Sequence, residues 1–141
     1  MLRYHHLKKL YPHTRGVEDD IHFKYVFTDC NILVNKGLYV PINSQGNDNR
    51  DLFTAIENGA VGSLWNEERE LPKYIPNHFP VFIVHDSYIA LKKLLVFYDN
   101  LLLLEDIGET NRSVFKGDIP IEENELNIKI LKLMKGGDNL A

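Results

Sequence analysis

The sequence predicts an α/β domain in which helices flank a mainly parallel sheet. Between residues 23 and 101, patterns typical of strands alternate with patterns typical of helices, and this alternation favours helices packed in layers on parallel strands. An uninterrupted apolar run at residues 81–84 is typical of a strand that is covered on both faces. We therefore expect the helices to join neighbouring strands through right-handed crossovers.

A short helix is expected near the N-terminus. Leu7 and Leu10 are spaced for one face of a helix over residues 4–10. Pro12 limits this helix, because proline disfavours the helical conformation of the residue before it. The polar residues 14–20 that follow are expected to form a turn.

Two strands are expected next. Residues 23–27 alternate in polarity and include aromatic and β-branched side chains, which predicts a strand. A second strand is expected over residues 37–42. Because Pro41 cannot donate a ladder hydrogen bond, this second strand either lies at an edge of the sheet or ends at the proline.

A polar loop over residues 43–50 precedes the next predicted helix. Asn49 or Asp51 is expected to cap the start of this helix, and Gly59 stands where a residue with left-handed backbone geometry ends it. The short apolar segment 60–65 that follows is expected to form a buried strand.

The last predicted helix follows the apolar strand. Residues 66–79 contain two prolines and are expected to form an irregular connection. Beyond residues 81–84, either Asp86 or Ser87 is expected to cap a helix over residues 88–101, in which leucines and a tyrosine repeat at helical spacing.

The end of the chain gives a weaker pattern. Residues 105–116 show no convincing periodicity. The apolar residues of 126–134 fit one face of a helix, and several of them also fit the alternation of a strand, so both interpretations stay open.

Composition restricts the classes of function. The chain has 141 residues, of which 44% are hydrophobic, with a formal charge of −4, so one domain with its own core and no nucleic-acid partner is expected. The most apolar segment, residues 88–104, is short and contains charges, so we expect no membrane insertion. The single cysteine, Cys30, and the absence of a signal-peptide pattern predict a cytoplasmic protein.

Several segments, in a fixed order and spacing, resemble a known family. They are Thr28-Asp29-Cys30-Asn31, residues 35–42, the loop 43–52, the helix end and strand start at residues 55–61, and residues 81–95. This series resembles the N-terminal domain of the Mur ligases, above all the tripeptide synthetases and the D-Ala-D-Ala-adding enzymes. These enzymes extend UDP-N-acetylmuramoyl precursors of bacterial cell-wall peptidoglycan.

The resemblance implies a Mur-ligase N-terminal-like domain over residues 1–104 and a C-terminal extension over residues 105–141. It also implies that a UDP moiety binds near the turn after the first strand, the polar loop and the start of the following helix. The residues implied in this way are Thr28, Asp29, Cys30, Asn31, Ser44, Gln45, Asp48, Asn49, Arg50 and Asp51.

The physical chemistry of these residues suits a nucleotide diphosphate. A helix that begins near Asp51 directs free N–H groups and the positive end of its dipole toward a phosphate, and Arg50 can add a charge-assisted contact. Three positions differ from the family pattern: Cys30 replaces its serine, Asn31 replaces its arginine, and Asn49-Arg50 replaces its Gly-His pair.

Ligation by this family also requires an ATP-binding P-loop. The chain has no Gly-Lys-Ser or Gly-Lys-Thr sequence, so we expect no autonomous ligase activity, no catalytic residues and no cofactor. The predicted function is non-catalytic recognition of a UDP-N-acetylmuramoyl peptide, with a separate ligase polypeptide or self-association as possible partners. The alternatives are a degenerate domain that serves as a protein-interaction or regulatory module, and a truncated piece of a full Mur ligase.

Other chemistry has little support in the sequence. The six histidines lack the spacing of a metal site, so no bound metal is expected. Cys30 has no cation beside it in sequence and is expected to be a buried or half-buried apolar group. His85 and Asp86 lie at a strand end, where ligand sites of α/β folds gather, but capping of the next helix by Asp86 is the simpler role.

Overall fold

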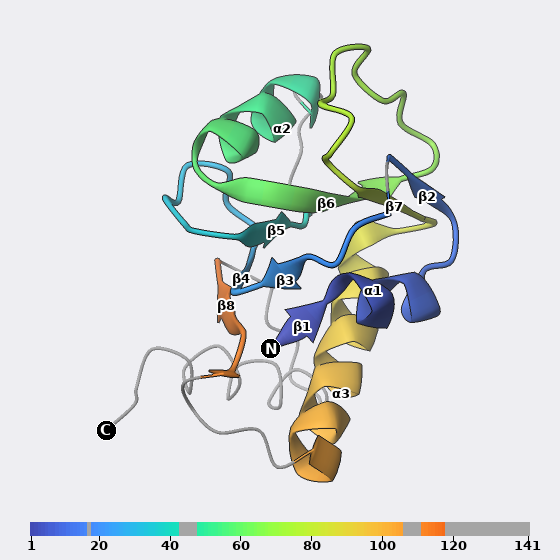
Figure 1. The fold of residues 1–141 in the computed structure, drawn as a ribbon. Helices are drawn as coiled ribbons and strands as arrows, with labels where there is room; N and C mark the ends of the chain where they lie inside the picture. The colour runs from blue at the N-terminus through green and yellow to red at the C-terminus, as the bar shows by residue number, and fades with distance from the viewer. Residues whose placement is uncertain (17, 43–47, 106–110, 118–141) are drawn as a thin grey trace.

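The computed structural model describes residues 1–16, 18–42, 48–105 and 111–117. These residues form a six-stranded mixed sheet with helices on both faces (Figure 1). The strand order is β2-β7-β6-β5-β4-β8, and among these strands only β2 is antiparallel to its neighbour. The predicted class, a mainly parallel α/β sheet flanked by helices, is confirmed.

Four parallel strands follow one another across the centre of the sheet in chain order. They are β4 (Tyr25–Phe27), β5 (Gly37–Tyr39), β6 (Ala60–Asn66) and β7 (Val81–Val84). Since β5 lies between β4 and β6, it is an interior strand that ends before Pro41, which settles the two alternatives for this segment. The Val40 N–H still donates to the Phe27 carbonyl at 2.9 Å.

The strand predicted over residues 23–27 is divided between two sheets. Its first part is β3 (His22–Phe23), which pairs antiparallel with β1 (Leu2–Arg3) in a separate two-stranded sheet. At Lys24 the backbone changes partner, and its N–H donates to the Lys36 carbonyl at 2.9 Å. The alternation of polarity along a sequence cannot show where a strand changes its pairing partner, because the backbone is extended on both sides of the change.

The two outer strands were not predicted. β2 (Thr14–Arg15) lies in the segment expected to be a turn and pairs antiparallel with β7. β8 (Val114–Lys116) lies in the segment without periodicity and pairs in parallel with β4. Strands of two or three residues are too short to show a period of two, so only their long-range pairing identifies them. Residues 126–134, with their two open interpretations, lie outside the described part of the chain.

Within the described residues, three helices cover the sheet. α1 (Tyr4–Leu10) has the predicted bounds, and α3 (Ser87–Glu105) extends beyond the predicted end at residue 101. The Asp86 carboxylate caps α3 by accepting the N–H groups of Tyr88 and Ile89 at 2.8 and 3.1 Å, as one of the two predicted caps. No helix in the described ranges is long and apolar enough to cross a membrane.

α2 (Asp48–Glu57) starts earlier than the sequence predicted. Asn49 and Asp51 therefore lie inside its first turn, and the prediction that one of them caps the helix is wrong. The polar character of residues 43–50 concealed the helix start, because polar side chains suit the exposed face of a first turn as well as a loop. Gly59, with φ of 114°, follows the helix in the left-handed geometry that was predicted.

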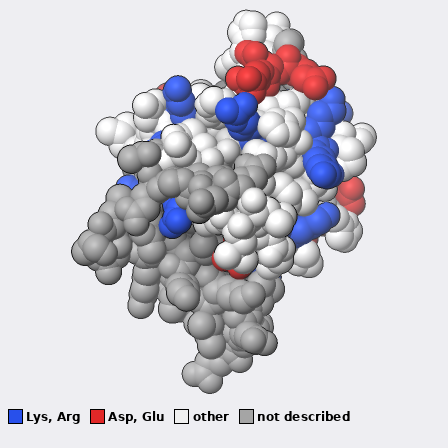
Figure 2. Space-filling model, turned by 60° about the horizontal axis from the view of Figure 1, so that its bottom comes forward, with Lys and Arg blue, Asp and Glu red and all other residues white. Residues whose placement is uncertain are grey.

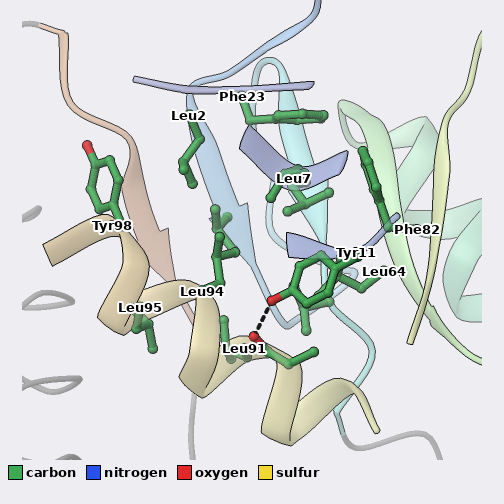
Figure 3. Close-up of a cluster of buried hydrophobic side chains, with 14 of the residues drawn as sticks. Leu2, Leu7, Tyr11, Phe23, Leu64, Phe82, Leu91, Leu94, Leu95 and Tyr98 are labelled. Atoms are coloured by element: carbon green, nitrogen blue, oxygen red, sulfur yellow. Dashed lines mark hydrogen bonds between the residues drawn. The ribbon is translucent and has the colours of Figure 1, made fainter. Parts of the chain in front are cut away.

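Two hydrophobic clusters fill the space between the layers. The larger cluster lies between the sheet and α1 and α3, and its side chains converge from both helices and from β1, β3, β6 and β7 (Figure 3). The smaller cluster lies on the opposite face, under α2, and includes Phe27, Tyr39, Leu52 and Trp65. The domain is therefore a three-layer α/β/α arrangement.

Buried Ser113 joins β8 to the N-terminal strands and to α3. Its hydroxyl donates to the Phe23 carbonyl at 2.6 Å and accepts the Leu2 N–H at 2.8 Å. Its own N–H donates to the Tyr98 hydroxyl at 2.6 Å. These bonds satisfy buried backbone groups. The bonds to Phe23 and Leu2 connect residues that are 90 and 111 positions apart in sequence.

Candidate functional site

The carboxyl ends of the parallel strands meet at one edge of the sheet. The segments that leave this edge are residues 28–31 after β4, 40–42 after β5, 67–69 after β6 and 85–88 after β7. α/β folds bind ligands at this edge, outside the carboxyl ends of their strands. The candidate site is therefore built from these segments and from the helix starts beside them.

Residues 28–31 form a tight turn after β4. The Asp29 carboxylate accepts the Asn31 N–H at 3.0 Å, and the Asp29 carbonyl accepts the Ile32 N–H at 3.1 Å. The Thr28 N–H donates to the Lys116 carbonyl at 3.1 Å, which ties the turn to the end of β8. Asp29 and Asn31 are exposed and Thr28 is half-buried, so the turn offers polar side chains to the solvent.

Cys30 attaches this turn to α2. Its carbonyl accepts a hydrogen bond from the Asn58 side chain at 2.8 Å, and its side chain packs against the smaller hydrophobic cluster. Burial raises the pKa of the Cys30 thiol, and the carboxylates of Asp51 and Asp29 raise it further. Cys30 is half-buried, as expected, and its neighbours are negative, so it is a poor nucleophile.

The other predicted site residues lie on or before the first turn of α2. Asn49 and Arg50 are exposed there, and the Arg50 carbonyl accepts the Thr54 hydroxyl at 3.0 Å. Ser44 and Gln45 lie outside the described residues, and Asp48 is described only as the first residue of α2. Of the described members of the predicted set, Asp51 in α2 is near enough to Cys30 in the turn for its carboxylate to raise the pKa of the thiol.

α3 also begins at this edge, but its first turn is already occupied. The Asn66 side-chain oxygen accepts both the N–H and the hydroxyl of Ser87, each at 2.7 Å. Asp86 accepts the next two N–H groups of the helix. At a helix start, these N–H donors are the groups that would otherwise bind an anion. In α3 they already donate to side chains of the protein itself.

A pocket of about 280 Å³ lies on the same edge, beside the start of α3. Its walls come from the segments at the ends of β5, β6 and β7 and from the first turn of α3. They include Pro41, Ile42, Glu68, Arg69, His85 and Tyr88. Sequence reasoning noted only His85 and Asp86 here. A signal that could have identified this part of the edge is the run of polar residues at the end of a buried strand: Asn66 is the last residue of β6, and Glu67 and Glu68 follow it directly, as Thr28 follows β4.

The described residues around the site carry charges of both signs, with Asp29 and Glu68 acidic and Arg50 and Arg69 basic. Among the described residues on the face drawn in Figure 2, Asp and Glu side chains gather in one group, and Lys and Arg side chains lie in several separate places. In the described part of the chain, no three His, Cys, Asp or Glu side chains are grouped as a metal site requires.

His85 and Glu67 form an exposed pair beside the pocket. The His85 Nδ1 atom lies 2.7 Å from a Glu67 carboxylate oxygen. The hydrogen bond and the negative charge of Glu67 raise the pKa of His85. His85 therefore has a higher pKa in the folded protein than in the unfolded chain. Any contribution of the His85–Glu67 pair to the free energy of unfolding is complete at pH values below the pKa of the unfolded chain. This contribution is lost as the pH rises through the pKa of the folded protein.

We expect Glu67→Gln to lower the pKa of His85 toward its ordinary value, because the amide keeps a polar contact but removes the charge. An NMR titration of the His85 ring protons measures this shift. Glu70→Gln, a change of an exposed carboxylate in the same connection, is the control and should leave the pKa nearly unchanged. An equal pKa in the wild-type protein and Glu67→Gln would contradict the pairing.

No family model matches this chain, and no curated protein matches it.

Proposed function

We propose that this domain binds the UDP moiety of a UDP-linked muramoyl peptide without catalysing a reaction on it. The ligand would lie at the carboxyl edge of the sheet, between the turn at residues 28–31 and the first turn of α2. The main support is that the turn at residues 28–31 lies against α2: the Asn58 side chain, just after the helix, donates to the Cys30 carbonyl at 2.8 Å, and the Asp51 carboxylate is near enough to raise the pKa of the Cys30 thiol. The family resemblance assigns this turn and the start of α2 to one site.

The two helices that begin near this edge differ in what they can offer a phosphate. The first turn of α3 is capped by Asn66 and Asp86, whereas Arg50 is exposed in the first turn of α2. A helix start with an adjacent guanidinium is a favourable site for a diphosphate. α2 is therefore the element to which we assign phosphate binding.

The negative charges near Cys30 restrict where the diphosphate can lie. Asp29 and Asp51 both act on the thiol, and a diphosphate beside them would be repelled. The phosphates are therefore expected on the Arg50 side of the turn. The pocket beside Arg69 and His85 lies on the same edge of the sheet and offers room for the sugar or peptide part.

Calorimetric titration of UDP and of a UDP-N-acetylmuramoyl peptide into the full chain tests the proposal. We expect saturable binding, and we expect Arg50→Ala to weaken it by about 10- to 100-fold, as loss of a charge-assisted hydrogen bond does. Arg15→Ala is the matched control, because Arg15 is exposed on β2, at the other end of the strand order from β4. The control should bind as the wild-type chain does.

Alkylation of Cys30 gives an independent measurement. Bound ligand should slow the reaction of the thiol with iodoacetamide, and Asp51→Asn should speed it, because removal of a negative charge lowers the thiol pKa. Absence of heat at millimolar ligand together with no protection of Cys30 would rule out the proposed site.

A further inference from the structure

The pocket beside the start of α3 lies where the chain changes from one face of the sheet to the other. β6 and β7 are parallel neighbours. The connection that leaves β6 covers the same face as α2, because its Leu71 and Ile75 pack against the smaller hydrophobic cluster. α3, which leaves β7, covers the opposite face. The two connections diverge at the carboxyl ends of β6 and β7, and such a point is the usual place of a ligand site in an α/β sheet.

Asn66, at the end of β6, offers hydrogen-bond donors to this pocket. Its Oδ1 atom accepts both the N–H and the hydroxyl of Ser87, and these two donors fix the orientation of the amide. Within the described part of the chain, the Nδ2 group of Asn66 has no hydrogen-bond partner. Because Asn66 is half-buried and lines the pocket, its two N–H groups can donate to a ligand there.

Arg69 stands beside Asn66 on the pocket wall. Its N–H donates to the Asn66 carbonyl at 3.1 Å, and its carbonyl accepts the indole N–H of buried Trp65 at 3.1 Å. These two bonds belong to the backbone, so they hold residue 69 at the pocket whatever its side chain is. The guanidinium group adds a positive charge to the amide donors of Asn66, and this combination suits a carboxylate.

Two carboxylates lie on the wall of the same pocket. Glu68 is exposed, and Asp86 uses a single oxygen, Oδ1, to cap α3, so its second oxygen can accept a further bond. Glu67 is paired with His85 and balances the charge of that ring when it is protonated. The pocket thus presents a guanidinium with amide donors and also two carboxylates. A ligand with charge of only one sign would be repelled by one of these sets.

We propose that this pocket binds a small zwitterion, a molecule with one carboxylate and one ammonium group. Asn66 and Arg69 bind the carboxylate, and Glu68 and Asp86 bind the ammonium group. The volume of about 280 Å³ lies just below the range of pockets for drug-sized ligands, so the ligand is small. This inference does not rest on the proposed UDP site, which was assigned to the turn after β4 and the start of α2.

NMR titration of the isotope-labelled full chain with glycine, β-alanine and γ-aminobutyrate tests the proposal. The two charges of these probes are progressively further apart, so the series measures the spacing that the pocket selects. At least one probe should bind saturably, with a dissociation constant of about 0.1 to 10 mM, and should shift the side-chain amide signal of Asn66. The matched carboxylate without the ammonium group, and the matched amine without the carboxylate, should each bind at least about tenfold more weakly.

Two pairs of variants test the two charged ends of the pocket. Arg69→Gln removes the guanidinium but keeps the backbone bonds, and it should weaken binding by about tenfold or more. Lys73→Gln is its control, because Lys73 is an exposed cation of the same connection and does not line the pocket. Glu68→Gln should also weaken binding, whereas Glu70→Gln, outside the pocket, should leave it unchanged. Circular dichroism of each variant checks the fold.

Three results would overturn the proposal. The first is the absence of saturable shifts for all three probes at about 20 mM. The second is equal binding of a zwitterion and either of its single-charge analogues, because the pocket would then not recognise both charges. The third is a set of shifts that leaves residues 66–69 and 85–88 unaffected. Arg50→Ala should not alter binding of the zwitterion, so failure of the UDP site and failure of this pocket are distinguishable.

Discussion

Replacing Gly59 by alanine is expected to destabilise the domain by about 3–5 kcal/mol, which is a large part of the roughly 5–15 kcal/mol typical of a whole domain. Two costs add at this position. The backbone has a φ of 114°, which residues with a side chain rarely adopt. A Cβ atom at Gly59 would also overlap the Val34 carbonyl oxygen.

The surrounding backbone cannot easily move away from this contact. The Val34 N–H donates to the Asn58 carbonyl at 2.8 Å, and the Gly37 N–H donates to the Gly59 carbonyl at 3.0 Å. These bonds hold the connection before β5 against the end of α2. Asn58 also donates to Cys30, so movement here would disturb the turn of the candidate site as well as the fold.

Urea unfolding followed by circular dichroism measures the loss. Glu57→Ala is the control, because Glu57 is exposed at the end of the same helix, and its replacement should change the free energy of unfolding by no more than about 0.5 kcal/mol. A loss below about 1 kcal/mol in Gly59→Ala would show that Gly59 does not pack against Val34 as described.

The elements that could be predicted from sequence have strong local patterns. α3 repeats its buried leucines at helical spacing along most of its length, and β7 is an apolar run of four residues. Gly59 and Asp86 were identified because helix ends need particular chemistry: a left-handed residue at one end and a side-chain acceptor at the other. In each case the information lies within a few residues of the element itself.

The remaining features depend on partners far away in the sequence. β2 and β8 form because β7 and β4 offer them an edge to pair with, and the local sequence does not encode that pairing. The same limit applies to the candidate site. The resemblance to a family suggested Cys30 and Asp51 as site residues. The hydrogen bonds from Ser87 to Asn66 and from His85 to Glu67 can be predicted only when it is known which strand ends are neighbours.

Phe82→Ala is expected to cost about 3–5 kcal/mol of stability, as truncation of buried aromatic residues usually does. The Phe82 side chain is fully buried in the larger cluster. Its ring centroid lies 5.4 Å from that of Tyr4 in α1 and 6.5 Å from that of Phe23 in β3. Truncation would therefore leave a cavity where α1 and the two-stranded sheet meet β7.

The size of the loss distinguishes this packing from general loss of hydrophobic surface. Phe82→Leu keeps much of the volume and should cost less than Phe82→Ala, because less of the cavity is left empty. Tyr74→Ala removes an aromatic side chain that is 84% exposed and should change the free energy of unfolding by no more than about 0.5 kcal/mol. Equal losses for Phe82→Ala and Tyr74→Ala in urea would contradict the assignment of Phe82 to the core. A large loss confined to Phe82 would mean that this ring helps to hold the N-terminal residues to the sheet, since it meets rings from both α1 and β3.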